Sequence, residues 1–197
     1  MKHILLLSLF FVPFQIPLLA MQQKKYNKEK TKELQSHVHW LVVHGDIHED
    51  RIKEGAQNII KLVKEGADPN AESNTLQVLP ISWAAARGFL DAVNVLLEYG
   101  ANPKLQDSIA LFDALESRHS SHKTKEQMVR LMLEYGVDPN VTRENKVRIY
   151  TTDKPTLIPL LLAYYFHPYI CHVLFEYGAD WKVLPEDHRK WMLQKLL

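Results

Sequence analysis

One five-residue phrase recurs four times along the 197-residue chain and constrains its fold more than any other feature. The copies are GADPN at 66–70, GANPK at 100–104, GVDPN at 136–140 and GADWK at 178–182. Glycine supplies the left-handed backbone position that ends a helix, and a proline shortly afterwards prevents the helix from resuming. The glycines are 34, 36 and 42 residues apart. A period of this length predicts a solenoid of stacked repeats.

Apolar residues precede each glycine at the same three places, which lie seven, four and three residues earlier. They are Ile59, Leu62 and Val63; Val93, Leu96 and Leu97; Val129, Met132 and Leu133; and Cys171, Leu174 and Phe175. This spacing predicts a helix with one buried face before every copy of the phrase. Short helices of this kind cannot bury their apolar faces alone, so neighbouring repeats are expected to cover them.

The most regular unit is Leu79–Lys104, in which Gly88 separates a predicted helix at Leu79–Gly88 from a second at Phe89–Tyr99. The segment LPISWAAARG at 79–88 resembles the T-P-L-H-x-A-A-x-x-G opening of the ankyrin repeats, with Leu79 replacing threonine and Ser82 replacing histidine. Looser matches lie at Ile109–Ala114, Ile158–Ala163 and Val38–Gly45.

The resemblance covers about residues 34–183. It implies an all-α, ankyrin-type solenoid of about four helix-turn-helix repeats, at about 34–70, 71–104, 105–140 and 141–182. Residues 184–197 are expected to form a C-terminal capping helix that begins near Pro185. The lysine-rich residues 21–33 are interpreted as a solvated basic linker or as the polar start of the first helix.

Several boundaries follow from local signals. The first repeat is expected to hold helices at about Leu34–His44 and Glu54–Glu65, with an insertion at Asp46–Lys53 between them. In the third repeat, Thr124 is expected to cap the second helix after a long loop. In the fourth, Pro159 lies in the first turn of a helix at Leu157–Phe166, and Cys171 occupies a buried apolar column.

The first twenty residues resemble a targeting segment. Lys2 and His3 precede the apolar run Ile4–Val12, and Ala20 is a small residue at a plausible cleavage point. This pattern predicts a signal peptide at 1–20 and export to the periplasm or the extracellular space. The run is short for spanning a bilayer, which needs about 20 apolar residues. An uncleaved N-terminal membrane anchor is the alternative.

The composition and the motifs give no support for an enzyme. The formal net charge of +1 provides no electrostatic case for nucleic acid, and the single cysteine precludes an intrachain disulfide. The sequence has no phosphate-cradling glycine loop, H-E-x-x-H, C-x-x-C or G-x-S-x-G motif. We therefore expect a non-enzymatic protein without a cofactor.

Two groups of histidines are candidates for a metal-binding or catalytic site. His37, His39, His44 and His48 could form a metal site, but their spacing does not place them on one helical face. No site metal is therefore assigned, and metal binding through this cluster is kept as a minor alternative. His119 and His122 lack a nucleophile elbow or an orienting carboxylate, so a solvated loop explains them.

The resemblance implies that a protein partner binds along the concave face of the first helices and along the fingers, which are the exposed turns between one helix pair and the next. The positions carried over onto that face are Trp40, His44, Trp83, Arg87, Asp113, Ser117, Leu162 and Phe166. The longest finger, Val141–Thr156, adds Arg148 and Tyr150 on a β-prone stretch that could form a hairpin. Aromatic and arginine side chains suit interfaces, but Trp40, Trp83, Leu162 and Phe166 could equally pack between repeats.

The sequence therefore favours an exported, monomeric protein-binding module. A structural or inhibitory subunit of an envelope complex is the alternative, and no feature identifies the partner.

Overall fold

A computed structural model of the chain describes residues 26–44, 49–144, 156–184, 186 and 189. The first-repeat helices are α1 (Lys28–Val43) and α2 (Glu49–Lys64), and the second-repeat helices are α3 (Pro80–Ala86) and α4 (Leu90–Glu98). The third repeat holds α5 (Leu105–Glu116) and α6 (His122–Glu134). The fourth holds α7 (Pro159–Phe166), the 3-10 turn η2 (Pro168–Ile170) and α8 (Cys171–Glu176), and the 3-10 turn η3 (Trp181–Val183) follows.

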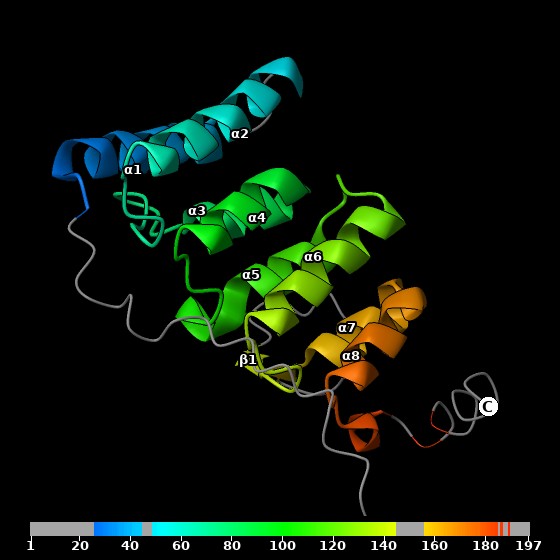
Figure 1. Cartoon of the computed structure of the whole chain (residues 1–197). Helices are drawn as coiled ribbons and strands as arrows, with labels where there is room; N and C mark the ends of the chain where they lie inside the picture. Colours follow the sequence, from blue (N-terminus) through cyan, green and yellow to red (C-terminus); the bar gives the residue numbers. More distant parts are fainter. Residues whose placement is uncertain (1–25, 45–48, 145–155, 185, 187–188, 190–197) are drawn as a thin grey trace, which may run out of the picture.

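The helix pairs stack in order to form the all-α, ankyrin-type solenoid that the sequence predicts (Figure 1). The first helices α1, α3, α5 and α7 form one layer, and the second helices α2, α4, α6 and α8 form the other. Each helix packs on its own partner and on the corresponding helix of the next repeat. The contacts between repeats therefore join neighbours in the stack, as expected for a quasi-linear solenoid.

The recurring phrase is built in the same way each time. All four glycines adopt positive φ angles, from +81° at Gly136 to +101° at Gly100, which is the region that only glycine enters at little cost. The N–H of the following residue returns to the helix, as Ala101 N–H does to the Leu96 carbonyl at 2.8 Å. This bond and the one from the Gly100 N–H to the Leu97 carbonyl satisfy carbonyls at the helix end.

The third residue of each phrase closes the turn with its side chain. The side-chain oxygens of Asp68, Asn102, Asp138 and Asp180 each accept a hydrogen bond from the N–H two residues later, at 2.8 to 3.1 Å. Short Asx side chains make this bond readily, which explains why the phrase keeps Asp or Asn there. The repeated sequence is therefore a repeated turn.

The predicted apolar columns form the core. All twelve residues before the four glycines are buried except Phe175, which is partly buried and packs against the same core. Cys171 is 4 % exposed, as its place in the column predicts, and burial raises the pKa of its thiol to about 12. Because only the thiolate is strongly nucleophilic, this cysteine is a small core residue.

The first repeat begins earlier than predicted. Asn27 caps α1 by accepting hydrogen bonds from the N–H groups of Glu29 and Lys30 at 3.0 and 3.2 Å, so the helix starts at Lys28. Of the two interpretations of 21–33, the polar start of the first helix therefore applies from Lys28 onward. Likewise α2 starts at Glu49 within the expected insertion, with Glu49 and Asp50 in its first turn.

The third repeat differs from the prediction at the start of its second helix. In its first helix, Gln106, Asp107 and Ser108 have positive φ angles of 51° to 57°, so the regular part of α5 begins after Ser108. Ser121, and not Thr124, caps α6, because its hydroxyl accepts from the Thr124 N–H at 3.1 Å.

The longest finger rests on a short two-stranded ladder. Strands β1 (Arg143–Glu144) and β2 (Thr156–Leu157) pair antiparallel, with Arg143 opposite Leu157. The hairpin predicted nearer the tip lies outside the described residues, as do Arg148 and Tyr150. The ladder leads into α7, where Pro159 occupies the first turn as predicted.

Other expectations also fall on residues that the structure leaves undescribed. These are the signal peptide at 1–20, His48 and most of the capping helix at 184–197. Within the described residues, none of the helices has the length and apolar character needed to span a membrane.

Candidate partner-binding surface

The first helices all end at the same edge of the stack, opposite the turn phrases (Figure 1). We name this the first-helix edge and define it by Val43, His44, Arg87, Glu116, Tyr165 and Phe166, the solvent-accessible side chains of the last helical or capping residues. Equivalent positions in stacked repeats come side by side, so these residues form a row across the stack.

The two ends of the row are apolar and well exposed. The exposed fraction is 56 % for Val43 at one end and 52 % for Phe166 at the other. Between them, Arg87 is partly exposed and Glu116 is exposed, which gives the row a charged centre. Single exposed apolar side chains are ordinary on a protein surface, so the row is a candidate contact site only as a set.

Trp40 and His44 extend this edge along α1. Their rings stack with centroids 5.0 Å apart, and His44 Nδ1 donates to the Trp40 carbonyl at 2.9 Å. The indole remains 38 % exposed. Stacking fixes the orientation of a large flat side chain, which lowers the entropy that binding would cost.

The prediction that Trp83 faces a partner is wrong. Trp83 is only 5 % exposed and stacks on Phe89 with ring centroids 5.6 Å apart. It follows the buried Leu79 by four residues, which places both on one helical face. Leu162 is also buried, so for both residues packing between repeats is the correct interpretation.

Asp113 and Ser117 of the third repeat lie inward of the edge. Ser117 is buried, so it offers no area to a partner and its assignment is corrected. The partly buried Asp113 accepts a hydrogen bond from the Ser82 hydroxyl across the α3–α5 junction. Burial raises the pKa of Asp113 to about 6, although the Ser82 bond and the positive charge of Arg143 oppose this shift. Asp113 therefore contributes to the junction between the second and third repeats.

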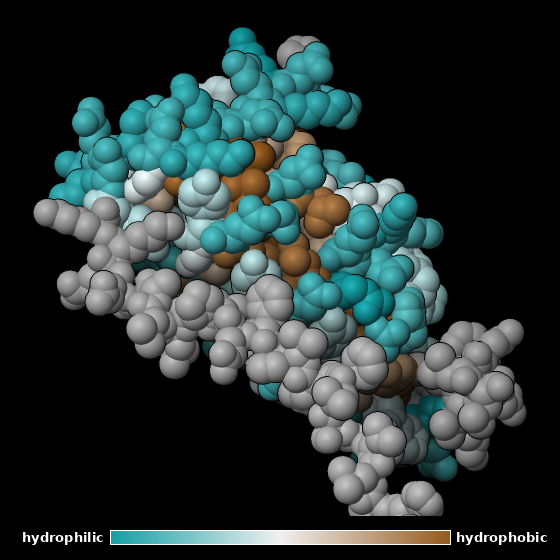
Figure 2. Space-filling model, viewed as in Figure 1, coloured by the Kyte–Doolittle hydropathy of each residue, from teal (hydrophilic) through white to brown (hydrophobic). Residues whose placement is uncertain are grey.

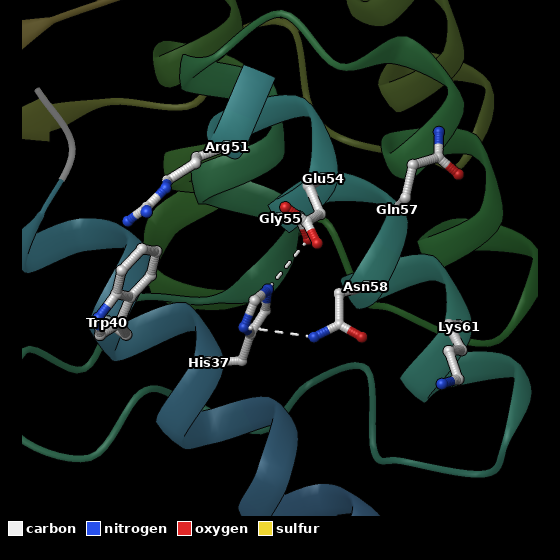
Figure 3. A pocket seen from close by; sticks show the side chains of 8 residues that line it. All are labelled: His37, Trp40, Arg51, Glu54, Gly55, Gln57, Asn58 and Lys61. Atoms are coloured by element: carbon white, nitrogen blue, oxygen red, sulfur yellow. Dashed lines mark hydrogen bonds between the residues drawn. The ribbon is translucent and has the colours of Figure 1, made fainter. Parts of the chain in front are cut away.

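A recess lies on the outer face of the first repeat, between α1 and α2. It has a volume of about 650 Å³, and its lining is mostly polar (Figure 3). The lining residues are His37, Trp40, Arg51, Glu54, Gly55, Gln57, Asn58 and Lys61. His37 spans the two helices, with Nε2 3.1 Å from the Gly55 carbonyl and Nδ1 3.4 Å from Asn58 Nδ2.

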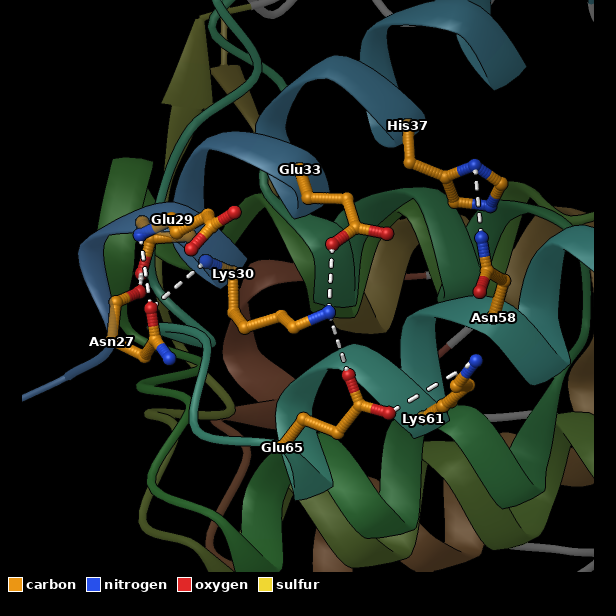
Figure 4. A network of polar contacts seen from close by, with 9 residues as sticks. Asn27, Glu29, Lys30, Glu33, His37, Asn58, Lys61 and Glu65 are labelled. Carbon is orange, nitrogen blue, oxygen red and sulfur yellow. Dashed lines mark hydrogen bonds and ion pairs between the residues drawn. The ribbon is translucent and has the colours of Figure 1, made fainter.

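The same outer face continues as an ion-pair network toward the start of α1. Lys30 Nζ pairs with Glu33 at 3.0 Å and with Glu65 at 2.9 Å, and Lys61 approaches Glu65 at 4.0 Å (Figure 4). In an interior repeat this face would be apolar and covered by the preceding repeat. Its polar character makes the first repeat a solvated end cap, as solenoids require.

The histidines near this cap are engaged separately. His37 contacts the second helix and His44 bonds to the backbone of its own helix. Among the residues that the structure describes, no three His, Cys, Asp or Glu side chains lie close enough to hold a metal ion.

A smaller recess of about 340 Å³ lies between α2 and the start of α4. Its floor includes Ala56, Ile60, Phe89, Leu90 and Ala92, and apolar surface is visible between these helices (Figure 2). Lys53 and Asp91 lie at its margin.

Sequence reasoning missed Val43, Glu116 and Tyr165 on the first-helix edge. Each immediately precedes a residue that was named, namely His44, Ser117 or Phe166. Of those three named residues, only Ser117 is buried.

Comparison with known proteins adds one positive finding. Residues 51–143 match the family model of the ankyrin repeats, with three copies. No curated protein matches the chain.

Proposed function

Because residues 51–143 are ankyrin repeats, which serve as protein–protein interaction modules, we propose that the chain binds a protein partner through its first-helix edge. The observation that carries this proposal is the row of solvent-accessible side chains at the ends of the first helices of all four repeats. In this proposal the chain is monomeric, non-enzymatic and free of cofactors.

The composition of the edge suggests how a partner is recognised. Tyr165 and Phe166 would supply apolar area, as Trp40 and Val43 do at the other end of the row. Arg87 in the second repeat would fix the register of the partner by a charge-assisted hydrogen bond. The finger residues Arg148 and Tyr150 remain candidates for additional contacts.

Affinity capture followed by mass spectrometry tests the proposal directly. The tagged chain, the edge variant Arg87→Glu and the control Glu98→Lys would be compared in extracts of the native cell. Glu98 is exposed at the far end of α4, so its substitution should not alter the edge. We expect one partner to be recovered with the wild type and the control but lost with Arg87→Glu. Equal recovery with all three would contradict the proposed surface.

We also propose that the first twenty residues direct export of the chain and are then removed by cleavage. The support is the order of a basic start, the apolar run Ile4–Val12 and the small residue Ala20. Cell fractionation with N-terminal sequencing should find a soluble exported protein that begins at Met21. An intact N-terminus in the membrane fraction would instead favour the uncleaved anchor, and an intact N-terminus in the cytosol would refute export.

A further inference from the structure

A buried lysine joins the third repeat to the fourth. Lys125 on α6 is 1 % exposed, yet its ammonium group has three acceptors. Its Nζ donates to the Leu115 carbonyl at 2.9 Å, to the Ser117 carbonyl at 2.5 Å and to His167 Nε2 at 2.9 Å. A lysine ammonium has three N–H donors, so every donor is used. A buried charge is tolerated only when it is satisfied in this way.

The contact with His167 is the one that crosses between repeats. His167 caps the C-terminus of α7, and its N–H donates to the Ala163 carbonyl at 2.7 Å. Since Nε2 accepts from Lys125, the imidazole is neutral and carries its proton on Nδ1, which lies 3.4 Å from the Tyr169 hydroxyl. The network thus requires a neutral histidine beside a charged lysine.

The surrounding charges reinforce this arrangement. Burial, and then the nearby charge of Lys125, lower the pKa of His167; hydrogen bonding with the Leu115 backbone opposes this shift, and the charge of His122 on α6 adds to it. Burial lowers the pKa of Lys125 to about 8. The ring of His122 stacks on Tyr169 at 4.3 Å, while Glu126 lies 3.6 Å from Arg130 and from His172 on α8. The carboxylate near this junction is therefore engaged with those two side chains.

We propose that Lys125 and His167 form a pH-sensitive connection that holds the fourth repeat on the third. Proton uptake at His167 Nε2 removes the acceptor of Lys125 and places a second positive charge against the ammonium group. The resulting repulsion favours movement of α7 and α8 away from α6. Acidification would therefore loosen the fourth repeat while leaving the first three stacked.

The sign follows from proton linkage. The pKa of His167 is lower in the folded protein than its ordinary value of 6.5, so the undocked repeat binds the proton more readily. The contribution to docking is complete above about pH 6.5 and is lost as the pH falls through the folded-state pKa. Because Phe166 precedes His167, the same step would disturb the first-helix edge, a consequence that rests on the proposed function.

Hydrogen exchange of the whole chain tests this connection without any partner. Protection of amides in α8, normalised to intrinsic exchange rates and compared with α4, would be measured at about pH 7.5 and pH 5.5. We expect protection in α8 to fall by up to about tenfold, because pH 5.5 lies about one unit below the ordinary pKa of 6.5. Protection in α4 should not fall, because the raised pKa of Asp113 favours the junction of the second and third repeats at the lower pH.

Two variants make the test specific. Glutamine offers Lys125 an oxygen acceptor but does not titrate, so His167→Gln should abolish the pH response. The control His44→Gln removes an exposed histidine at the other end of the stack, and this variant should retain the pH response. A response that persists in His167→Gln, or is absent from the wild type, would overturn the proposal.

The ring itself provides a measurement that needs no variant. Titration of the His167 ring by NMR should give a pKa below 6.5 and the Nδ1–H tautomer at neutral pH. A pKa at or above 6.5 would also overturn the proposal. Neither result bears on partner binding, which the affinity-capture experiment tests separately.

Discussion

The side-chain oxygen of Asn70 accepts a hydrogen bond from the backbone N–H of Asn102 at 2.7 Å, across 32 residues of sequence. The amide nitrogen of Asn70 also donates to the Gly100 carbonyl at 2.9 Å. Asn140 makes the same pair of bonds to Asp180 and Gly178, at 2.7 and 3.0 Å. The last residue of one turn phrase therefore holds the next phrase in place.

Removing this link should destabilise the stack. We predict that Asn70→Ala lowers the free energy of unfolding by about 2 kcal/mol, since two hydrogen bonds of about 1 kcal/mol each are lost. Urea denaturation monitored by circular dichroism measures the change. Asn74→Ala, in an exposed finger position, is the control and should have little effect. Equal midpoints for the two variants would contradict a linking role for Asn70.

The chain lacks this link at one place, which allows the opposite experiment. Lys104 occupies the position of Asn70 and Asn140 in the second phrase, and its Nζ lies beside Gly136. We predict that Lys104→Asn gains bonds to the Gly136 carbonyl and the Asp138 N–H and raises the free energy of unfolding by about 1 kcal/mol. Thermal denaturation of this variant beside Lys104→Ala separates the new bonds from the loss of lysine. If Lys104→Asn were no more stable than Lys104→Ala, the prediction would be refuted.

Gly55 of α2 packs against the side chain of Leu41 on α1. A Cβ atom at this position would lie 2.5 Å from Leu41 Cδ2, and Leu41 is buried. We predict that Gly55→Ala destabilises the chain by about 1–2 kcal/mol, because overpacking outweighs the better helix propensity of alanine.

A double-mutant cycle distinguishes this clash from other effects. In a Leu41→Ala background the obstruction is gone, so Gly55→Ala should become stabilising by up to about 1 kcal/mol. Additive effects in the cycle would show that Leu41 is not the obstacle.

Asp113 should make stability depend on pH. Burial raises the pKa of Asp113 from 3.8 to about 6, so the folded chain holds the proton more tightly than the unfolded chain. Its contribution is full below about pH 3.8 and is lost as the pH rises through about 6. About two pKa units correspond to about 3 kcal/mol.

The variant Asp113→Asn removes this dependence. Its stability relative to the wild type should increase by about 3 kcal/mol between about pH 4 and pH 7, as measured by urea denaturation at both values. Because the other titrating groups are common to both proteins, their effects cancel in the difference. A difference that does not change with pH would show that Asp113 keeps an ordinary pKa.

The solenoid was predictable because its signals are local. The turn phrase encodes a left-handed glycine and an Asx turn within five residues, and the columns before it follow helical periodicity. Even the early start of α1 had a local signal in Asn27, a favoured capping residue, although no capping box accompanied it.

The surface residues were harder to predict because burial depends on the neighbouring repeat. Trp83 has the character of an interface residue, but Phe89 and the adjacent helices cover it. Lys125 has the opposite character, since a lysine four residues into a helix is usually solvated. Its burial follows from carbonyls of α5 and a histidine of the fourth repeat that no local pattern connects to it.

The most direct test of the central claim is photo-crosslinking of the native complex from single positions. A photoreactive phenylalanine analogue would replace Phe166 on the first-helix edge and, in a matched variant, Glu98 at the opposite edge of the stack. We expect a defined crosslinked species from position 166 and none from position 98. Crosslinking from position 98 alone, or equally from both, would contradict binding through the first-helix edge.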